Sequence, residues 1–145
     1  MKNVLVAIDF HKKTEVLIDW AFSLTKPHRS KLWLIHVAAP DPDFVGNDVG
    51  PQYIRDDRAE TLRKEHRLLQ RYKESLEEKG TEVEALLIQG ATIETILEEA
   101  DKLSIELIAC GHHQHGFLYN AIFGSTSSGI VNKSSIPVLV FPFDD

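Results

Sequence analysis

Residues 107–128 read LIACGHHQHGFLYNAIFGSTSS, an apolar run followed by glycine and histidine and then by glycine and hydroxyl residues. An apolar run of this length that stops at a glycine is typical of a buried strand. Glycine followed by serine and threonine is typical of the start of a helix, where free backbone N–H groups can hold an anion. The stretch therefore predicts a strand, a loop and a helix that together hold a phosphate group.

The rest of the chain repeats the pattern of a buried strand followed by a helix. Five strands are predicted, at residues 3–8, 31–37, 81–88, 105–109 and 136–141. Their apolar runs show little alternation with polar residues, which indicates strands covered on both faces. The helices between them are long enough to cross over to a parallel neighbour. The predicted fold is therefore α/β, an open, mostly parallel five-stranded sheet with helices on both faces.

Helical periodicity places the predicted helices. Thr14 is the predicted N-cap of the first helix. Its apolar stripe consists of Val16, Leu17, Trp20, Ala21 and Leu24. The second helix is predicted at about 56–78 with Gly80 as its C′ residue. Its stripe consists of Ala59, Leu62, His66, Leu69, Tyr72 and Leu76. A third helix follows Gly90, and the last begins near Ser125.

Length and composition limit the classes of protein to consider. The chain of 145 residues is predicted to form a single domain, residues 1–145. Its formal net charge of −6 argues against a general nucleic-acid binder, which would engage phosphates through clustered Lys and Arg. Cys110 is the sole cysteine, and its place at the end of an apolar run favours a core residue over a reactive thiol. We expect a cytoplasmic protein without a membrane span, because the first apolar run is too short to cross a bilayer.

Three segments that are distant in the sequence are predicted to meet at one crevice. Asp9, Val37 and Gly111 lie at the carboxyl ends of predicted strands, where open parallel sheets bind ligands. A long loop, residues 38–53, follows Val37. Asp9 suits a ribose hydroxyl, a divalent ion held through water, or the cap of the following helix. Gly111 and Ser125 have ordinary interpretations too, as a turn residue and a helix N-cap.

The histidines allow more than one interpretation. His112, His113 and His115 raise the alternative of a metal site, because imidazole is a common ligand of zinc and nickel. Adjacent loop histidines rarely face one ion, so we expect no metal site and interpret them as solvated residues beside a phosphate pocket. His36 is interpreted as a hydrogen-bonded core residue. The sequence contains no Walker A motif, nucleophile elbow or zinc-protease motif, so no catalytic residue is predicted.

Six segments together resemble the universal stress protein family over essentially the whole chain. They are residues 4–9, 35–37, 89–90, 107–111, 124–126 and 136–140. The resemblance implies a Rossmann-like fold of the kind found in adenine nucleotide alpha hydrolases, with strand order 3-2-1-4-5. It also implies a homodimer formed along the last strand, through Val138, Val140 and Phe141.

Nucleotide-binding members of that family have a glycine, two residues, a second glycine, nine residues, and then Gly-Ser or Gly-Thr. Gly111 and Gly124-Ser125 occupy the first and last places, whereas Gln114 occupies the second. The Gln114 side chain either fills space that a phosphate needs or donates its amide to phosphate. The resemblance implies that the phosphates lie along Gly111, His113, Gly124, Ser125 and Thr126. It also implies that Ala7 and Val37 line the adenine and that Asp9 holds the ribose.

The function that the resemblance implies is that of a small cytosolic stress-response sensor or adaptor. It would bind an adenine nucleotide, ATP or AMP, with magnesium in the case of ATP, and would not need to catalyse a reaction. Two alternatives stay open. One is a homodimeric interaction module without nucleotide, and the other is a slow ATPase, for which Asp9 or a loop histidine is the sole evident general base.

Overall fold

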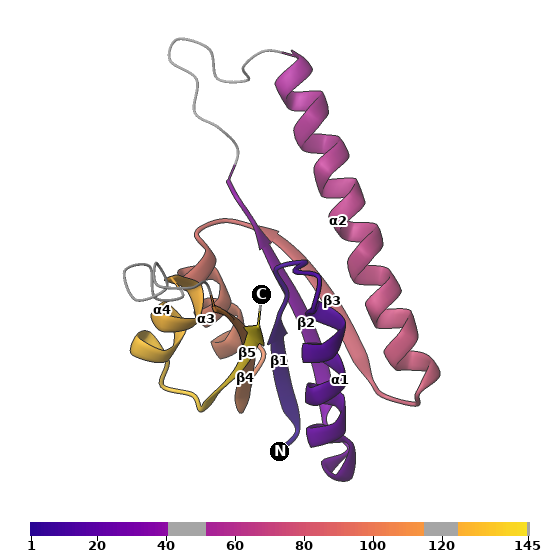
Figure 1. Ribbon diagram of the computed structural model, residues 1–145, viewed down its shortest axis with the longest axis vertical. Coiled ribbons are helices and arrows are strands. Elements are labelled where there is room, and N and C mark those ends of the chain that lie inside the picture. Colours follow the sequence, from indigo (N-terminus) through magenta and orange to yellow (C-terminus); the bar gives the residue numbers. More distant parts are fainter. Residues whose placement is uncertain (41–51, 115–124, 145) are drawn as a thin grey trace.

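The computed structural model describes residues 1–40, 52–114 and 125–144 of the chain (Figure 1). Strands and helices alternate along it, as the sequence predicts. The elements are β1 (Asn3–Ala7), α1 (Thr14–Thr25), the 3-10 helix η1 (Lys26–His28), β2 (Lys31–Ala38), α2 (Gln52–Glu78), β3 (Val83–Gln89), α3 (Thr92–Lys102), β4 (Leu107–Gln114), α4 (Ser125–Lys133) and β5 (Val138–Asp144).

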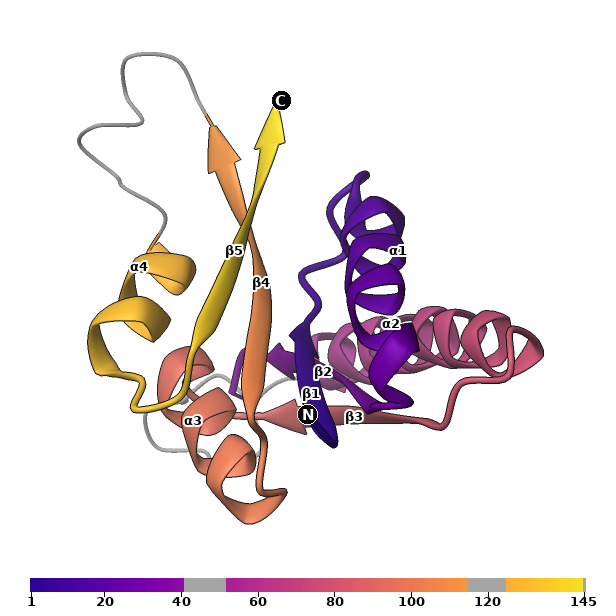
Figure 2. The same ribbon diagram turned by 90° about the horizontal axis from the view of Figure 1, so that it is seen from below.

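The five strands form one sheet with the order β3-β2-β1-β4-β5. Each adjacent pair is parallel, which confirms the predicted fold class and strand order. Figures 1 and 2 show α1 and α2 on one face of the sheet and α3 and α4 on the other. The strand order reverses between β1 and β4, so the carboxyl ends of these strands open onto the crevice where such sheets bind ligands.

Two apolar cores lie on the two faces of the sheet, because successive strand residues point to opposite sides. In β1, Val4 and Val6 belong to the core under α1 and α2, whereas Leu5 belongs to the core under α3 and α4. All three side chains are fully buried. Burial of a side chain of this size stabilises the fold by roughly 1.5–3 kcal/mol, which explains why β1 is a continuous apolar run.

The predicted stripe of α1 is wrong in its phase. Thr14 is the first residue of the helix and not its N-cap, which is Lys13 without a side-chain cap hydrogen bond. The buried side of α1 consists of Thr14, Leu17, Ile18, Ala21 and Thr25. Val16, Trp20 and Leu24 are 42%, 58% and 44% exposed. Thr14 N–H donates to the carbonyl of His11, so a turn in the preceding loop fixes where the helix starts and which side faces the sheet.

Helix α2 begins earlier than predicted, so residues 52 and 53 of the predicted loop are helical. Residues 41–51 of that loop lie outside the described residues. Leu69 and Leu76 are buried as expected, but His66 is exposed. Glu65 takes the inner position instead and faces His36. Gly80 follows the helix with φ of +83°, the left-handed conformation expected of a C′ glycine.

Strands β4 and β5 extend further than predicted because they continue to pair beyond the apolar runs. Gly111 pairs with Phe141, and Gln114 pairs with Asp144. Gly111 therefore lies within a strand and not at its end, and His112 and His113 are strand residues. Pro142 is accommodated within β5, since β5 has a neighbour on one side within the described sheet. Among the helices that the structure describes, none is long and apolar enough to cross a membrane.

Candidate functional site

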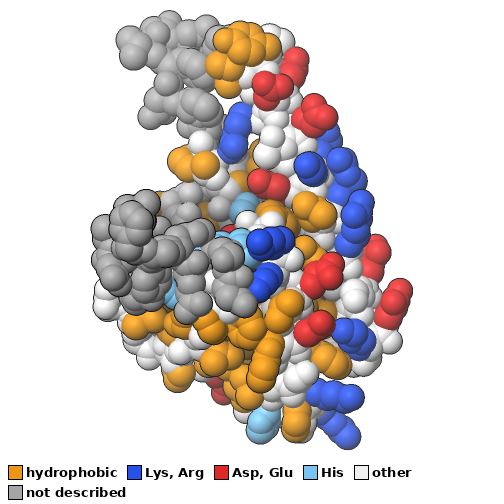
Figure 3. Space-filling model, viewed as in Figure 1, with side chains coloured by type: hydrophobic (Ala, Val, Ile, Leu, Met, Phe, Trp, Pro, Cys, Tyr) orange, Lys and Arg blue, Asp and Glu red, His pale blue; other side chains and the backbone are white. Residues whose placement is uncertain are grey.

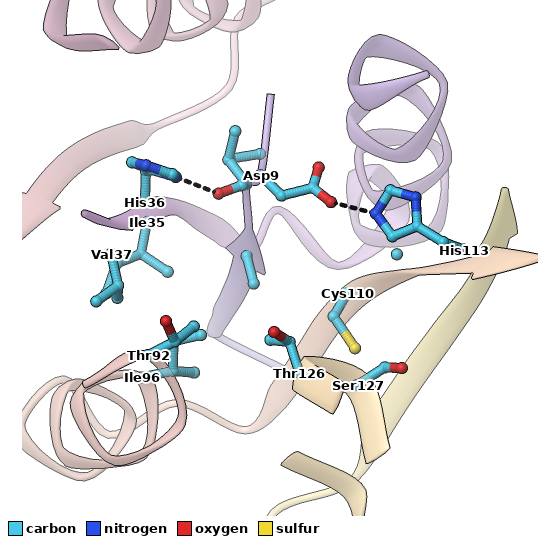
Figure 4. Close-up of a pocket in the computed structure, with 13 residues that line it drawn as sticks. Asp9, Ile35, His36, Val37, Thr92, Ile96, Cys110, His113, Thr126 and Ser127 are labelled. Atoms are coloured by element: carbon cyan, nitrogen blue, oxygen red, sulfur yellow. Dashed lines mark hydrogen bonds and ion pairs between the residues drawn. The ribbon is translucent and has the colours of Figure 1, made fainter. Parts of the chain in front are cut away.

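A pocket of about 240 Å³ opens at the carboxyl ends of β1, β2 and β4. The first turns of α3 and α4 close its other side (Figure 4). Its lining combines apolar, hydroxyl and imidazole side chains: Ala7, Ile8, Asp9, Ile35, His36, Val37, Thr92, Ile96, Cys110, Gly111, His113, Thr126 and Ser127. The pocket therefore offers apolar walls together with a polar side.

Six of the nine site residues predicted from the sequence line this pocket. They are Ala7, Asp9, Val37, Gly111, His113 and Thr126. Of the other three, Ser125 is the first residue of α4 and Gln114 is the last residue of β4. Their side chains and the whole of Gly124 lie outside the described residues. The structure thus brings segments from the two ends and the middle of the chain to one place.

Asp9 closes the turn between β1 and α1. Its Oδ1 accepts a hydrogen bond of 3.0 Å from the His11 backbone N–H. Its Oδ2 lies 2.7 Å from Nε2 of His113, across the pocket mouth (Figure 4). The alternative in which Asp9 caps helix α1 is wrong, because its carboxylate holds the preceding turn. Phe10 next to it has φ of 59°, a conformation rarely adopted by a bulky residue, so the turn is tightly constrained.

His113 belongs to an aromatic cluster beside the pocket. Its ring contacts His11 edge-on with the centroids 4.6 Å apart, and it meets Phe143 at 5.4 Å. The His11 ring in turn stacks on Phe143 at 4.6 Å. The Lys13 backbone N–H donates to His11 Nδ1, which holds that ring in the turn. These contacts fix the place of His113 from the α1 side.

His36 is hydrogen-bonded through Nδ1 and faces a carboxylate through Nε2, but it is not enclosed in the core. Its Nδ1–H donates to the carbonyl of Ile8 at 2.7 Å, and its Nε2 lies 3.4 Å from Oε2 of Glu65. Phe10 packs on the ring with the centroids 4.5 Å apart. The prediction of a hydrogen-bonded histidine is confirmed, whereas its place in the lining of the pocket was not predicted.

Cys110 lies in the floor of the pocket and is 2% exposed. Burial raises the pKa of its thiol from the ordinary value of 9.0 to about 11, and the nearby charge of Asp9 adds to this rise in pKa. The thiol is therefore protonated at neutral pH and is a poor nucleophile. This confirms the interpretation of Cys110 as a core residue.

His112 and His113 are adjacent in β4 and so point to opposite faces of the sheet. His112 is 7% exposed, and its Nδ1 lies 3.2 Å from Oγ of Ser127 on α4, so the interpretation of His112 as a solvated loop residue is wrong. The two imidazoles therefore do not face one ion. Within the described residues, no group of three or more His, Cys, Asp or Glu side chains is arranged to hold a metal. His115 lies outside those residues.

The sequence reasoning missed several lining residues, chief among them Thr92, Ile96 and Ser127. Thr92 and Ile96 lie on the first turns of α3, directly beyond the carboxyl end of β3. The Gln89-Gly90 pair marks that strand end and could have indicated them. Ser127 follows two hydroxyl residues at the start of α4, so the serine and threonine cluster itself was the available signal.

Comparison with known proteins gives one consistent result. A sequence model of the universal stress protein family matches residues 1–142. Universal stress protein A of Yersinia pestis is 27% identical over 145 residues, covering 99% of this chain and 93% of its own.

Two solved structures share the fold. A universal stress protein family member from Arabidopsis thaliana, solved with AMP bound, has a TM-score of 0.71 at 18% identity and covers 99% of this chain and 93% of its own. A universal stress protein in complex with cAMP has a TM-score of 0.71 at 16% identity and covers 97% of this chain and 96% of its own. At these identities the structural likeness concerns the fold alone.

Proposed function

The chain belongs to the universal stress protein family, and from this premise we propose that it binds an adenine nucleotide in the pocket that Asp9, Val37 and Gly111 share. The observation that carries the proposal is the convergence of these three residues, one each from the carboxyl-terminal parts of β4 and β2 and one just after β1, on one cavity. Two proteins of the same fold were solved with AMP and with cAMP, which supports a nucleotide of the same base.

The lining suggests how each part of the ligand would lie. Ala7 and Val37 offer apolar surface for the base, and Asp9 offers a carboxylate for the ribose hydroxyls. His113 and Thr126 offer donors for phosphate beside the N-terminus of α4. Gly124 and Ser125 precede Thr126 in the sequence and complete the proposed phosphate side. At about 240 Å³ the cavity is smaller than the roughly 300–1,000 Å³ usual for ligand pockets, so it has room for a nucleoside rather than for a larger cofactor.

We place the protein in the cytoplasm as a sensor or adaptor whose state depends on the bound nucleotide. Catalysis is not part of this proposal. Asp9, His36 and His113 are the candidates for a general base in the lining. Asp9 and His113 are engaged with each other at 2.7 Å, and His36 donates its Nδ1–H to the carbonyl of Ile8. The slow ATPase therefore has less support than binding alone.

Thermal unfolding with and without nucleotide tests the proposal. A ligand that binds the native state alone raises the free energy of unfolding, by about 2.7 kcal/mol when its concentration is a hundred times Kd. The midpoint of thermal unfolding rises with it. We expect millimolar AMP to raise the midpoint of the intact chain. Thr92→Trp, at the exposed start of α3, should abolish the shift by filling the pocket mouth. Glu94→Trp, at an exposed position of the same helix outside the lining, should keep it. An unshifted midpoint with AMP and with ATP would contradict the proposal.

The second candidate function, a homodimeric interaction module, has its own support. Strand β5 is at the edge of the described sheet, and Val140 on it is 37% exposed. Residues 138–143 contain no charged residue of the kind that protects edge strands from pairing. We propose that two copies associate along β5 through Val138, Val140 and Phe141. This association is compatible with nucleotide binding at the strand ends.

A further inference from the structure

We propose that the pocket is a site for adenosine with one phosphate, AMP or a cyclic monophosphate, and that it discriminates against ATP. The inference rests on the proposed function and concerns the ligand class of the same site. Two features of the described residues carry it: the charge of the lining and the setting of His113.

The lining has no fixed positive charge. Among the described lining residues none is Lys or Arg, and residues 110–132 contain neither in the sequence. Two carboxylates are near the site instead: Asp9 at the mouth, with a side chain that is 49% exposed, and Glu65 behind His36. A triphosphate brings roughly twice the negative charge of a monophosphate into this negative field, so its binding is opposed more strongly.

The His113 imidazole is a hydrogen-bond donor whose position is fixed by its neighbours. Its Nε2 lies 2.7 Å from Asp9 Oδ2, and its ring is confined between His11 and Phe143. Its side chain is 33% exposed, so it can reach a group that enters the pocket mouth. If its Nε2–H turns from Asp9 to the ligand, this one imidazole holds one phosphate group by a charge-assisted hydrogen bond. Thr126 on the first turn of α4 offers a second donor to the same group.

Titration calorimetry on the full chain at neutral pH, with adenosine, AMP, ATP, and ATP with magnesium as ligands, tests the inference. We expect AMP to bind at least about tenfold more tightly than ATP, with or without magnesium, and more tightly than adenosine. His113→Gln should bring AMP affinity close to that of adenosine. His28→Gln, an exposed histidine of η1 outside the lining, is the matched control and should change neither.

The outcomes separate the two proposals. ATP affinity equal to or higher than AMP affinity would overturn this inference and leave the proposed function standing. Equal affinities for AMP and adenosine in the unaltered chain would also overturn it, because the phosphate would then contribute nothing. Absence of binding for all three adenine compounds would overturn the proposed function and this inference with it.

Discussion

Gly111 of β4 and Phe143 of β5 pack so closely that a Cβ atom on residue 111 would lie 2.1 Å from the Phe143 ring. Real Cβ atoms do not approach other atoms to this distance, so a side chain at residue 111 would have to displace the ring. Phe143 has little room to move, because it is fully buried and contacts His11, His113 and Phe141. The glycine at the first place of the nucleotide motif thus has a packing role that is independent of any ligand.

We expect Gly111→Ala to lower the free energy of unfolding by about 1–3 kcal/mol, the usual cost of overpacking a core. Urea denaturation measures it. In the double variant Gly111→Ala with Phe143→Leu, the smaller side chain relieves the clash, so the combined loss should be smaller than the sum of the two single losses. Additive losses would show that the two residues do not contact each other in solution.

Cys110 gives a pH dependence whose sign follows from its pKa. Burial raises the pKa of the folded thiol to about 11, above the ordinary 9.0. The folded state therefore keeps its proton where the unfolded state has lost it. The contribution to stability is fully present below pH 9 and is lost as the pH rises toward 11. Between pH 8 and pH 11 the free energy of unfolding of the unaltered chain should fall further than that of Cys110→Ala, which has no thiol to titrate. We expect the difference between the two falls to be about 2–3 kcal/mol. Equal losses would contradict the raised pKa.

The fold could be predicted from the sequence because its strands are continuous apolar runs. The run at residues 4–8 requires cover on both faces, and alternation with helices then requires parallel crossovers. The convergence of Asp9, Val37 and Gly111 followed from the same reasoning, since the carboxyl ends of parallel strands share one edge. The strand order came from the family resemblance, because apolar patterns do not state which strands are neighbours.

The errors arose where polar turns or distant partners override the apolar pattern. Trp20 fits an apolar stripe by spacing, yet the turn formed by Asp9 and His11 sets the start of α1 and turns this residue outward. Glu65 displaces His66 from the inner side of α2 because His36 offers it a partner. Strand β4 continues past Gly111 because β5 pairs beside it. The partners of Glu65 and of β4 are distant in the sequence, whereas the turn before α1 is local but is made by polar groups that an apolar pattern does not report.

A substitution at Gln114 should weaken the discrimination between AMP and ATP. It occupies the place of the second glycine in the nucleotide-binding pattern and ends β4. We expect Gln114→Gly to raise ATP affinity relative to AMP affinity, because the substitution removes the side chain and a phosphate can then approach the backbone. Titration calorimetry with both nucleotides measures the ratio. An unchanged ratio would show that Gln114 does not restrict the phosphates, and Gln89→Gly, at the end of β3 outside the lining, is the matched control.

The edge of β5 supplies a prediction about assembly. Ile108 N–H donates to the carbonyl of Pro137, so in the alternating pattern of a parallel ladder Val138 and Val140 direct their backbone groups away from β4. Pro142, the next residue in that series, has no N–H to offer. A second copy can therefore pair with this edge in the stretch around Val138 and Val140, and a two-fold axis would make the contact self-complementary.

Apolar side chains on α1 extend this edge. Trp20 lies 6.0 Å from the ring of Phe141, and Val16 and Leu24 lie one turn to either side of it on the helix. Figure 3 shows hydrophobic side chains gathered on this face, over α1 and β5. Exposed apolar surface of this kind, next to an open strand edge, is what association between copies would bury.

We expect the chain to sediment as a dimer and Val140→Lys to sediment as a monomer, because a lysine on an edge strand opposes pairing. Trp20→Ala should weaken the dimer by about tenfold, equivalent to 1.4 kcal/mol, since it removes apolar area beside the edge. Tyr53→Ala removes an aromatic that is 68% exposed on α2, away from β5, and should leave the dimer unchanged. Analytical ultracentrifugation over a range of concentrations separates these cases. A monomer at all concentrations would rule out association through β5. A dimer that Val140→Lys leaves intact would instead place the contact on another surface, and the Trp20→Ala result would then show whether α1 forms part of it.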